Sequence, residues 1–221
     1  VQTNVTAGLN WWHNIGQSLS PKANVTFYTQ TQTANVNVEP ITKPLMNPQN
    51  TSWSNETKDW ISQAMNNLGY SGTNYIEQVY DYANHIRNSL NTDWVFVIFV
   101  VDSLNDPDGL FSDYNIARSR VGGSFFVMSY DNGGYTIRYM DYVVAHETGH
   151  IFYAWDEYDG KVTDGKTSGG SGYMGYYEIE YSGMVMDKLN YTLWPNQENA
   201  SWGTLGQVGF LAWYLGPLPL C

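Results

Sequence analysis

The sequence has a single cysteine, Cys221, at its last position, and this scarcity excludes an internal disulfide. The stability of the fold must therefore come from packing, bound ions or attached glycans. An enzyme with a cysteine nucleophile finds no support, because Cys221 has no histidine near it in the sequence. The chain also lacks a long apolar run. The longest, residues 94–101, is far shorter than the roughly 20 residues of a membrane-spanning helix.

Charged side chains are scarce, and basic ones are the scarcest. Charged residues make up 14% of the 221 residues, and 10 Lys and Arg oppose 21 Asp and Glu, for a net charge of −11. Nucleic-acid binding needs clustered Lys and Arg, so we expect no nucleic-acid partner. The chain begins with Val rather than Met and shows no signal peptide, which suits a processed product or an excerpt. We therefore expect an extracellular or cell-surface protein without a transmembrane segment.

The hydrophobic pattern predicts an α/β (α+β) protein with a single domain spanning residues 1–221. Apolar residues at helical spacing alternate with β-branched and aromatic runs. Ser54 is a predicted N-cap and Gly69 a predicted helix stop. The predicted helices are 7–19, 54–69, 74–91 and 138–155, and the predicted strands are 24–33, 93–101 and 124–130. A subdomain of residues 1–158 would end in the last helix, and a loop-rich subdomain would follow at 159–221.

The most informative stretch is AHETGHIFYAWDEY, residues 145–158. Its two histidines, His146 and His150, are four residues apart, so on a helix they lie on one face and can bind one ion. Glu147 lies about 100° further round the helix, within reach of a water on that ion. This H-E-x-x-H pattern is that of zinc proteases, with the glutamate as general base. The simpler interpretation is a helix that merely contains two core or surface histidines.

A catalytic zinc needs a third protein ligand and an open position. Asp156 and Glu157 follow His150 by six and seven residues. With Asp156 as the last ligand, the stretch resembles the metzincin-type zinc peptidases, including secreted ones whose motif ends in Asp-Glu-Tyr. The chain departs from that pattern at Tyr153, where the family has a glycine that allows a sharp turn. A longer helix with Glu157 as the ligand therefore stays open. So does a zinc peptidase of another type, in which the third ligand is Glu178 or Glu180.

The resemblance implies a twisted mixed sheet with an edge strand, a central active-site helix and an irregular C-terminal subdomain. Residues 124–130 would be the edge strand, which can pair with an extended peptide. Met186 would form the methionine turn beneath the zinc. The implied activity is that of a secreted zinc endopeptidase, which hydrolyses peptide or protein substrates through a zinc-activated water, with Glu147 as general base. An alternative is a non-catalytic, glycosylated surface or filament-forming protein that keeps a peptidase-like fold and assembles with neighbouring copies.

Two further groups of residues suggest ligands or modifications. Clustered oxygen ligands around a turn can hold Ca²⁺, although an ordinary Asn-Asp-Pro-Asp-Gly turn explains the first group equally well. The candidate calcium ligands are Asp102, Asn105, Asp106, Asp108 and Asp113. The Asn-x-Ser/Thr pattern marks candidate glycosylation sites. These are Asn4, Asn24, Asn50, Asn55, Asn190 and Asn199.

Overall fold

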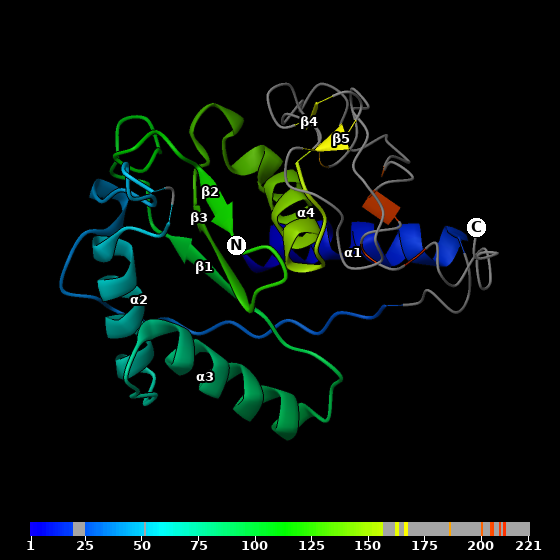
Figure 1. Ribbon diagram of the computed structural model, residues 1–221, viewed down its shortest axis with the longest axis horizontal. Coiled ribbons are helices and arrows are strands. Elements are labelled where there is room, and N and C mark those ends of the chain that lie inside the picture. Colours follow the sequence, from blue (N-terminus) through cyan, green and yellow to red (C-terminus); the bar gives the residue numbers. More distant parts are fainter. Residues whose placement is uncertain are drawn as a thin grey trace. The chain divides into compact units, whose positions relative to one another are not determined.

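The computed structural model describes residues 1–19, 25–50, 52–156, 162–163, 166–167, 186, 200, 204–205, 208 and 210. The chain forms two compact units, and in sequence the second lies between the two segments of the first. Unit 1 consists of Val1–Thr29 and Arg138–Cys221, and unit 2 of Gln30–Ile137. Among the described residues there are four α-helices and a three-stranded mixed sheet (Figure 1), which confirms the predicted α+β class.

Unit 1 is built on the contact between helices α1 (Gln2–Leu19) and α4 (Met140–Ile151). The two helices approach closely because α1 has a glycine at the crossing. A Cβ on Gly8 would overlap the Asp141 carbonyl oxygen and lie 2.8 Å from Val144 Cβ. Further along α1, the indole N–H of Trp12 donates a hydrogen bond of 2.8 Å to the Ala145 carbonyl. The first helix thus supports the helix that carries the histidine motif.

A hydrophobic core surrounds this helix pair. Trp12 is fully buried, and its ring meets those of Trp11, Phe152 and Phe210 edge to face. Trp11 and Trp12 are therefore packing residues of this core. The buried members of the cluster are Trp11, Trp12, Tyr142, Ala145, Ala154, Met186, Leu205 and Phe210. The predicted subdomain boundary near residue 158 stays a prediction, because most of 159–221 lies outside the described residues.

The strand predicted at 24–33 is wrong over its described part, since residues 25–36 form no strand there. The alternating sequence does produce alternating burial: Val25 and Phe27 pack against the core of unit 1, and Tyr28, which follows Phe27, is 75% exposed. Alternation specifies which side chains face the protein, but a strand also needs a hydrogen-bonded neighbour. Residues 25–36 are therefore extended chain outside a sheet.

Unit 2 contains the three-stranded sheet, in the order β1 (Val97–Val101), β3 (Phe125–Ser129), β2 (Ala117–Ser119). Strand β3 is parallel to β1 and antiparallel to β2. The prediction that 124–130 is the edge strand is therefore wrong. All five residues of β3 are buried, as a central position requires, and β1 and β2 are the two edge strands of this sheet. The short, partly polar sequence of β2 gave no strand signal, so the sequence could not place it.

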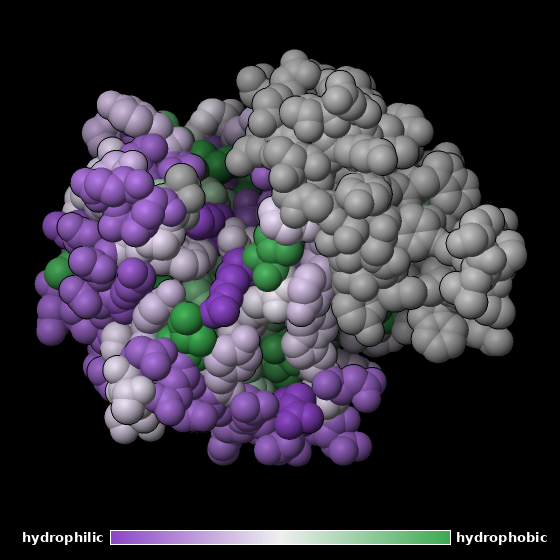
Figure 2. All heavy atoms as spheres, viewed as in Figure 1, coloured by the Kyte–Doolittle hydropathy of each residue, from purple (hydrophilic) through white to green (hydrophobic). Residues whose placement is uncertain are grey.

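Helices α2 (Asn55–Asn67) and α3 (Tyr75–Leu90) complete unit 2 and confirm two predicted helices. The Ser54 hydroxyl accepts from the Thr57 N–H at 2.9 Å, and Gly69 follows the helix with φ of +91°. Hydrophilic residues cover most of the surface over these helices, and the hydrophobic ones form separate patches (Figure 2). The remaining elements are the 3₁₀ turns Pro40–Thr42, Gly133–Tyr135 and Ile137–Tyr139, and the hairpin of β4 (Val162–Thr163) and β5 (Lys166–Thr167).

The helix crossing at Gly8 can be tested by adding a single methyl group. We expect Gly8→Ala to lower the free energy of unfolding by about 1–3 kcal/mol, because the new Cβ overlaps the backbone of α4. The control is Gly134→Ala, since a Cβ there meets no atom within 4 Å. Urea unfolding of both variants measures the difference. Equal stabilities would contradict the close approach.

Candidate metal centre

Helix α4 is buried on every side, as its sequence predicts for a helix inside the protein. Eleven of its twelve residues are buried, from Met140 to Ile151, with Asp141 as the exception. Apolar residues on all faces explain this burial. The helix therefore carries His146, Glu147 and His150 in the interior of the protein, where a charged group needs a partner.

The two histidines converge on a single carboxylate oxygen. The His146 Nε2 atom lies 3.4 Å from Asp156 Oδ1, and the His150 Nε2 atom lies 3.3 Å from the same oxygen. The imidazole rings are nearly perpendicular, with centroids 5.0 Å apart. One ligand atom from each of the three residues lies within 4.8 Å of the others, so this group can hold a metal ion.

These distances fit a bridging ion better than direct hydrogen bonds. A charge-assisted N–H···O bond is about 2.7–2.9 Å long. In a tetrahedral zinc site with bonds of about 2.0–2.1 Å, neighbouring ligand atoms are about 3.3–3.4 Å apart. Two imidazole nitrogens and one carboxylate oxygen also form a donor set that suits zinc and other transition metals, whereas Ca²⁺ and Mg²⁺ prefer oxygen ligands alone.

The chain returns to the helix through a tight turn at Tyr153. The helix ends at Ile151, and Tyr153 has φ of +75°. The Tyr153 N–H donates to the His150 carbonyl at 3.0 Å, and the Ala154 N–H donates to the Gly149 carbonyl at 2.9 Å. This pair of bonds is the Schellman ending of a helix. The sharp turn thus forms without the glycine, and it brings Asp156 to the histidines.

The left-handed conformation costs a tyrosine about 1–2 kcal/mol relative to the ordinary helical region. The two Schellman hydrogen bonds and the contacts of Asp156 offset this cost. The expectation of a longer helix is therefore wrong, and Asp156 is the third candidate ligand. Glu157, Glu178 and Glu180 lie outside the described residues.

The orientation of His150 is fixed by a second contact on the other side of its ring. His150 Nδ1 lies 2.9 Å from the Ala154 carbonyl oxygen, within the turn itself. A carbonyl only accepts, so Nδ1 carries a proton, and Nε2 is the nitrogen that faces Asp156 and can bind a metal once its own proton is lost. Such outer contacts set the tautomer and raise the basicity of metal-binding histidines. The same turn thus positions two of the three candidate ligands.

The electrostatics of the cluster favour charge on both partners. Burial lowers the pKa of His150, but the contact with Asp156 and its negative charge outweigh burial, with smaller contributions from Glu147 and the Ala154 carbonyl. The resulting pKa is about 9. Burial raises the pKa of Asp156, but the contacts and charges of the two histidines hold it well below its ordinary value. Without metal, the cluster therefore stores a proton that an incoming cation must displace.

The predicted general base lies beside this group. Glu147 is only 6% exposed, and its negative charge contributes to raising the pKa of His150. The glutamate is therefore held in the interior near the candidate metal ligands, as the sequence spacing predicts. Its role as a base stays a prediction.

Met186 packs directly against α4, the helix that carries the two histidines. It is fully buried, and a Cβ at Gly149 would overlap its sulfur and lie 3.1 Å from Trp12 Cζ2. Because Gly149, next to His150, has no side chain, Met186 and Trp12 can pack directly against α4 at this position. The sequence predicted Met186 near the site. It did not place Trp12 there, since nothing in the sequence pairs α1 with α4.

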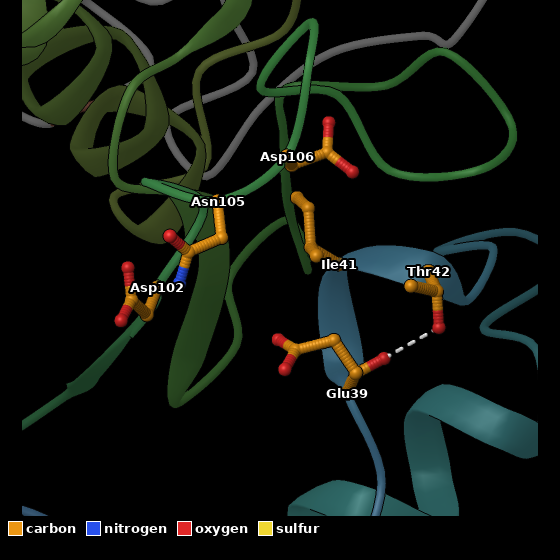
Figure 3. Close-up of a pocket in the computed structure, with 6 residues that line it drawn as sticks. All are labelled: Glu39, Ile41, Thr42, Asp102, Asn105 and Asp106. Atoms are coloured by element: carbon orange, nitrogen blue, oxygen red, sulfur yellow. Dashed lines mark hydrogen bonds between the residues drawn. The ribbon is translucent and has the colours of Figure 1, made fainter.

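The predicted calcium ligands do not gather in the same way. Asp106 and Asp108 accept hydrogen bonds from backbone N–H groups of their own turn, and Asp113 accepts from the Met46 N–H at 2.8 Å. Asp102, Asn105 and Asp106 line a shallow pocket with Glu39, Ile41 and Thr42 (Figure 3). Among the described residues, His146, His150 and Asp156 are the one group of three potential ligands that comes together. The calcium site stays a prediction.

The glycosylation sites are placed in part. Asn50 and Asn55 are exposed and Asn4 is half-buried, whereas Asn24, Asn190 and Asn199 lie outside the described residues. The Asn50 side-chain oxygen accepts from the hydroxyl of Ser52, the third residue of its sequon, at 2.8 Å. Exposure leaves room for a glycan at Asn50 and Asn55, and occupancy stays a prediction.

Comparisons of the chain with protein-family models, with curated proteins and with solved structures gave no match. The assignment of the site therefore rests on its residues and their geometry. A search of the described helices for one long and apolar enough to cross a membrane found none.

The candidate metal centre predicts one zinc ion per chain. We expect Asp156→Ala and His150→Ala to lower zinc affinity by about 100-fold or more, because each removes a ligand. His85→Ala is the matched control, an exposed histidine on α3. Zinc content after dialysis and chelator competition measure the effect. Full zinc binding by Asp156→Ala would contradict the assignment.

The raised pKa of His150 predicts opposite effects of pH with and without zinc. A pKa raised on folding stabilises the protein below the ordinary value of 6.5, and this contribution is lost as pH rises through about 9. The melting temperature of the metal-free protein should therefore fall between pH 6.5 and 9. Zinc replaces the proton, so its apparent affinity should rise over the same range. Melting curves with zinc or a chelator test this, and a metal-free protein that became more stable would refute it.

Proposed function

We propose that the protein is a zinc-dependent peptide hydrolase with His146, His150 and Asp156 as metal ligands and Glu147 as general base. The observation that carries the proposal is the convergence of both imidazoles on Asp156 next to a buried glutamate. A site that only stored or displayed a metal would need the three ligands. It would not need a carboxylate kept in the interior beside them, where burying a charge is costly.

The zinc would supply a Lewis acid that makes water a nucleophile at neutral pH and polarises a carbonyl group. The side chains of the chain would do the rest. Glu147 takes the proton from the attacking water and transfers it to the leaving amine. The hydrogen bond from His150 Nδ1 to the Ala154 carbonyl holds the ring so that Nε2 is the nitrogen that would bind the metal. The tyrosines that could stabilise the oxyanion, Tyr173, Tyr181 and Tyr191, lie outside the described residues.

The proposed substrates are peptides and unstructured protein segments in an extracellular setting. The acidic composition, with a net charge of −11, and the candidate glycosylation sites support this setting. The metzincin resemblance extends to the ligand order His, His, Asp and to the buried Met186 against the ligand-bearing helix. These features favour an endopeptidase over other zinc hydrolases.

The alternative is a glycosylated surface protein that keeps the metal for stability and uses its tyrosine-rich surface to assemble. Both functions predict zinc binding, so zinc alone does not separate them. The same set of ligands also binds Fe²⁺. Metal analysis of the purified protein would show whether it contains zinc or iron. Glu147 is the residue that distinguishes hydrolysis from a structural role.

The decisive variant is Glu147→Gln. Glutamine keeps the shape of the side chain but cannot take a proton, so we expect zinc binding to persist and cleavage of casein or a fluorogenic peptide to fall about 10²–10⁴-fold. The matched control is Glu56→Gln, an exposed glutamate at the start of α2, which should cleave like the wild type. Equal cleavage by wild type and Glu147→Gln would refute the mechanism, and a zinc-loaded wild type that cleaves no peptide would favour the surface protein.

A further inference from the structure

Tyr153 is the one exposed residue between Met140 and Asp156. Its side chain is 42% exposed, whereas Ile151 and Ala154 on either side of the turn are fully buried. The histidines and Glu147 are each less than 10% exposed. The ring of Tyr153 is therefore the part of this segment that a molecule from solvent can contact most readily.

The turn does not need this side chain. Both Schellman hydrogen bonds use main-chain atoms, Tyr153 N–H to the His150 carbonyl and Ala154 N–H to the Gly149 carbonyl. A glycine would make the same bonds at φ of +75° without a steric penalty. A bulky residue in the left-handed region is an outlier, and such outliers gather at functional sites. The main-chain bonds of the turn therefore do not account for a tyrosine at this position.

The position of Tyr153 ties it to the metal centre. It stands three residues after His150 and three before Asp156. Three residues span at most about 11 Å, so its Cα lies within that distance of each ligand's Cα. Its backbone N–H is bonded to the His150 carbonyl, and the carbonyl of the next residue holds the His150 ring. The ring thus projects from the segment that positions the ligands.

We propose that Tyr153 is a specificity residue whose ring contacts an apolar or aromatic side chain of the peptide bound at the metal centre. The peptide as ligand rests on the proposed function. An exposed phenol ring offers an apolar face and edge to such a side chain, and aromatic pairs prefer offset or edge-to-face contact. A tyrosine also presents this surface at little entropic cost, since only two side-chain torsions are fixed.

The test uses two zinc-binding probes that differ only in their side chain, phenylalanine hydroxamate and glycine hydroxamate. Their affinities for the zinc-loaded protein are compared in the wild type and in four variants. Tyr153→Phe keeps the ring, and Tyr153→Ala removes it while the left-handed strain stays. Tyr153→Gly removes both the ring and the strain. Tyr114→Ala is the matched control, since Tyr114 is a second exposed tyrosine with positive φ, at +63°.

We expect the wild type to prefer the phenylalanine probe by about 3- to 10-fold, in keeping with one aromatic contact. The preference should persist in Tyr153→Phe and Tyr114→Ala and disappear in Tyr153→Ala and Tyr153→Gly. Zinc affinity should stay within about threefold in all variants. Tyr153→Gly should melt about 2–4 °C above Tyr153→Ala, because glycine relieves the left-handed strain. The proposal is overturned if the wild type shows no preference, or if Tyr153→Ala keeps it.

The hydroxamate readout is independent of hydrolysis, so the two proposals can fail separately. A zinc-loaded wild type that prefers the phenylalanine probe but cleaves no peptide would refute the proposed function and leave only the contact between the Tyr153 ring and a metal-bound ligand standing. Peptide cleavage with equal KM for aromatic and glycine substrates in the wild type and Tyr153→Ala would refute the role of Tyr153 and leave the hydrolase standing.

Discussion

The candidate metal centre depends on one shared contact, the oxygen of Asp156 that lies 3.3–3.4 Å from both imidazoles. Two histidines four residues apart on a helix are brought to one face by helix geometry alone. In the interior they still need a negative partner, because burying a cationic group without compensation is costly. Asp156 provides that charge, and its own pKa is lowered by the two histidines in return. The turn at Tyr153 makes this contact possible, because it brings the chain back towards α4.

The buried helix in turn depends on small residues that let other elements approach it. Gly8 brings α1 against α4, and Gly149 leaves room for Met186 and Trp12 beside His150. The bond from the Trp12 indole to the Ala145 carbonyl joins residues 133 positions apart. The close packing of protein interiors means that α4, and the ligands on it, are held by neighbours on all sides. A peptidase site in this position would be rigid before any substrate arrives.

Part of this structure could be predicted from the sequence. The amphipathic and capping patterns gave helices α2 and α3 nearly to the residue, and the apolar run with the H-E-x-x-H spacing gave α4. The errors have a common cause. Residues 124–130 are a central strand and 24–33 form no strand over their described part, because strand pairing depends on a distant neighbour. The candidate calcium ligands are close in sequence, and Asp106 and Asp108 accept hydrogen bonds from backbone N–H groups of their own turn, so the calcium site stays a prediction.

The sequence by itself determined that His146 and His150 share a helix face with Glu147 beside them, because the period of the helix converts a spacing of four into proximity. It left the third ligand open between Asp156, Glu157 and more distant glutamates. Only the tertiary structure brought Asp156 to both imidazoles as a candidate ligand, since that contact depends on a tyrosine accepting a left-handed conformation. The packing of α1 and Met186 against α4 was likewise decided only by the tertiary structure. Contacts between residues far apart in the chain follow from packing, which no local pattern encodes.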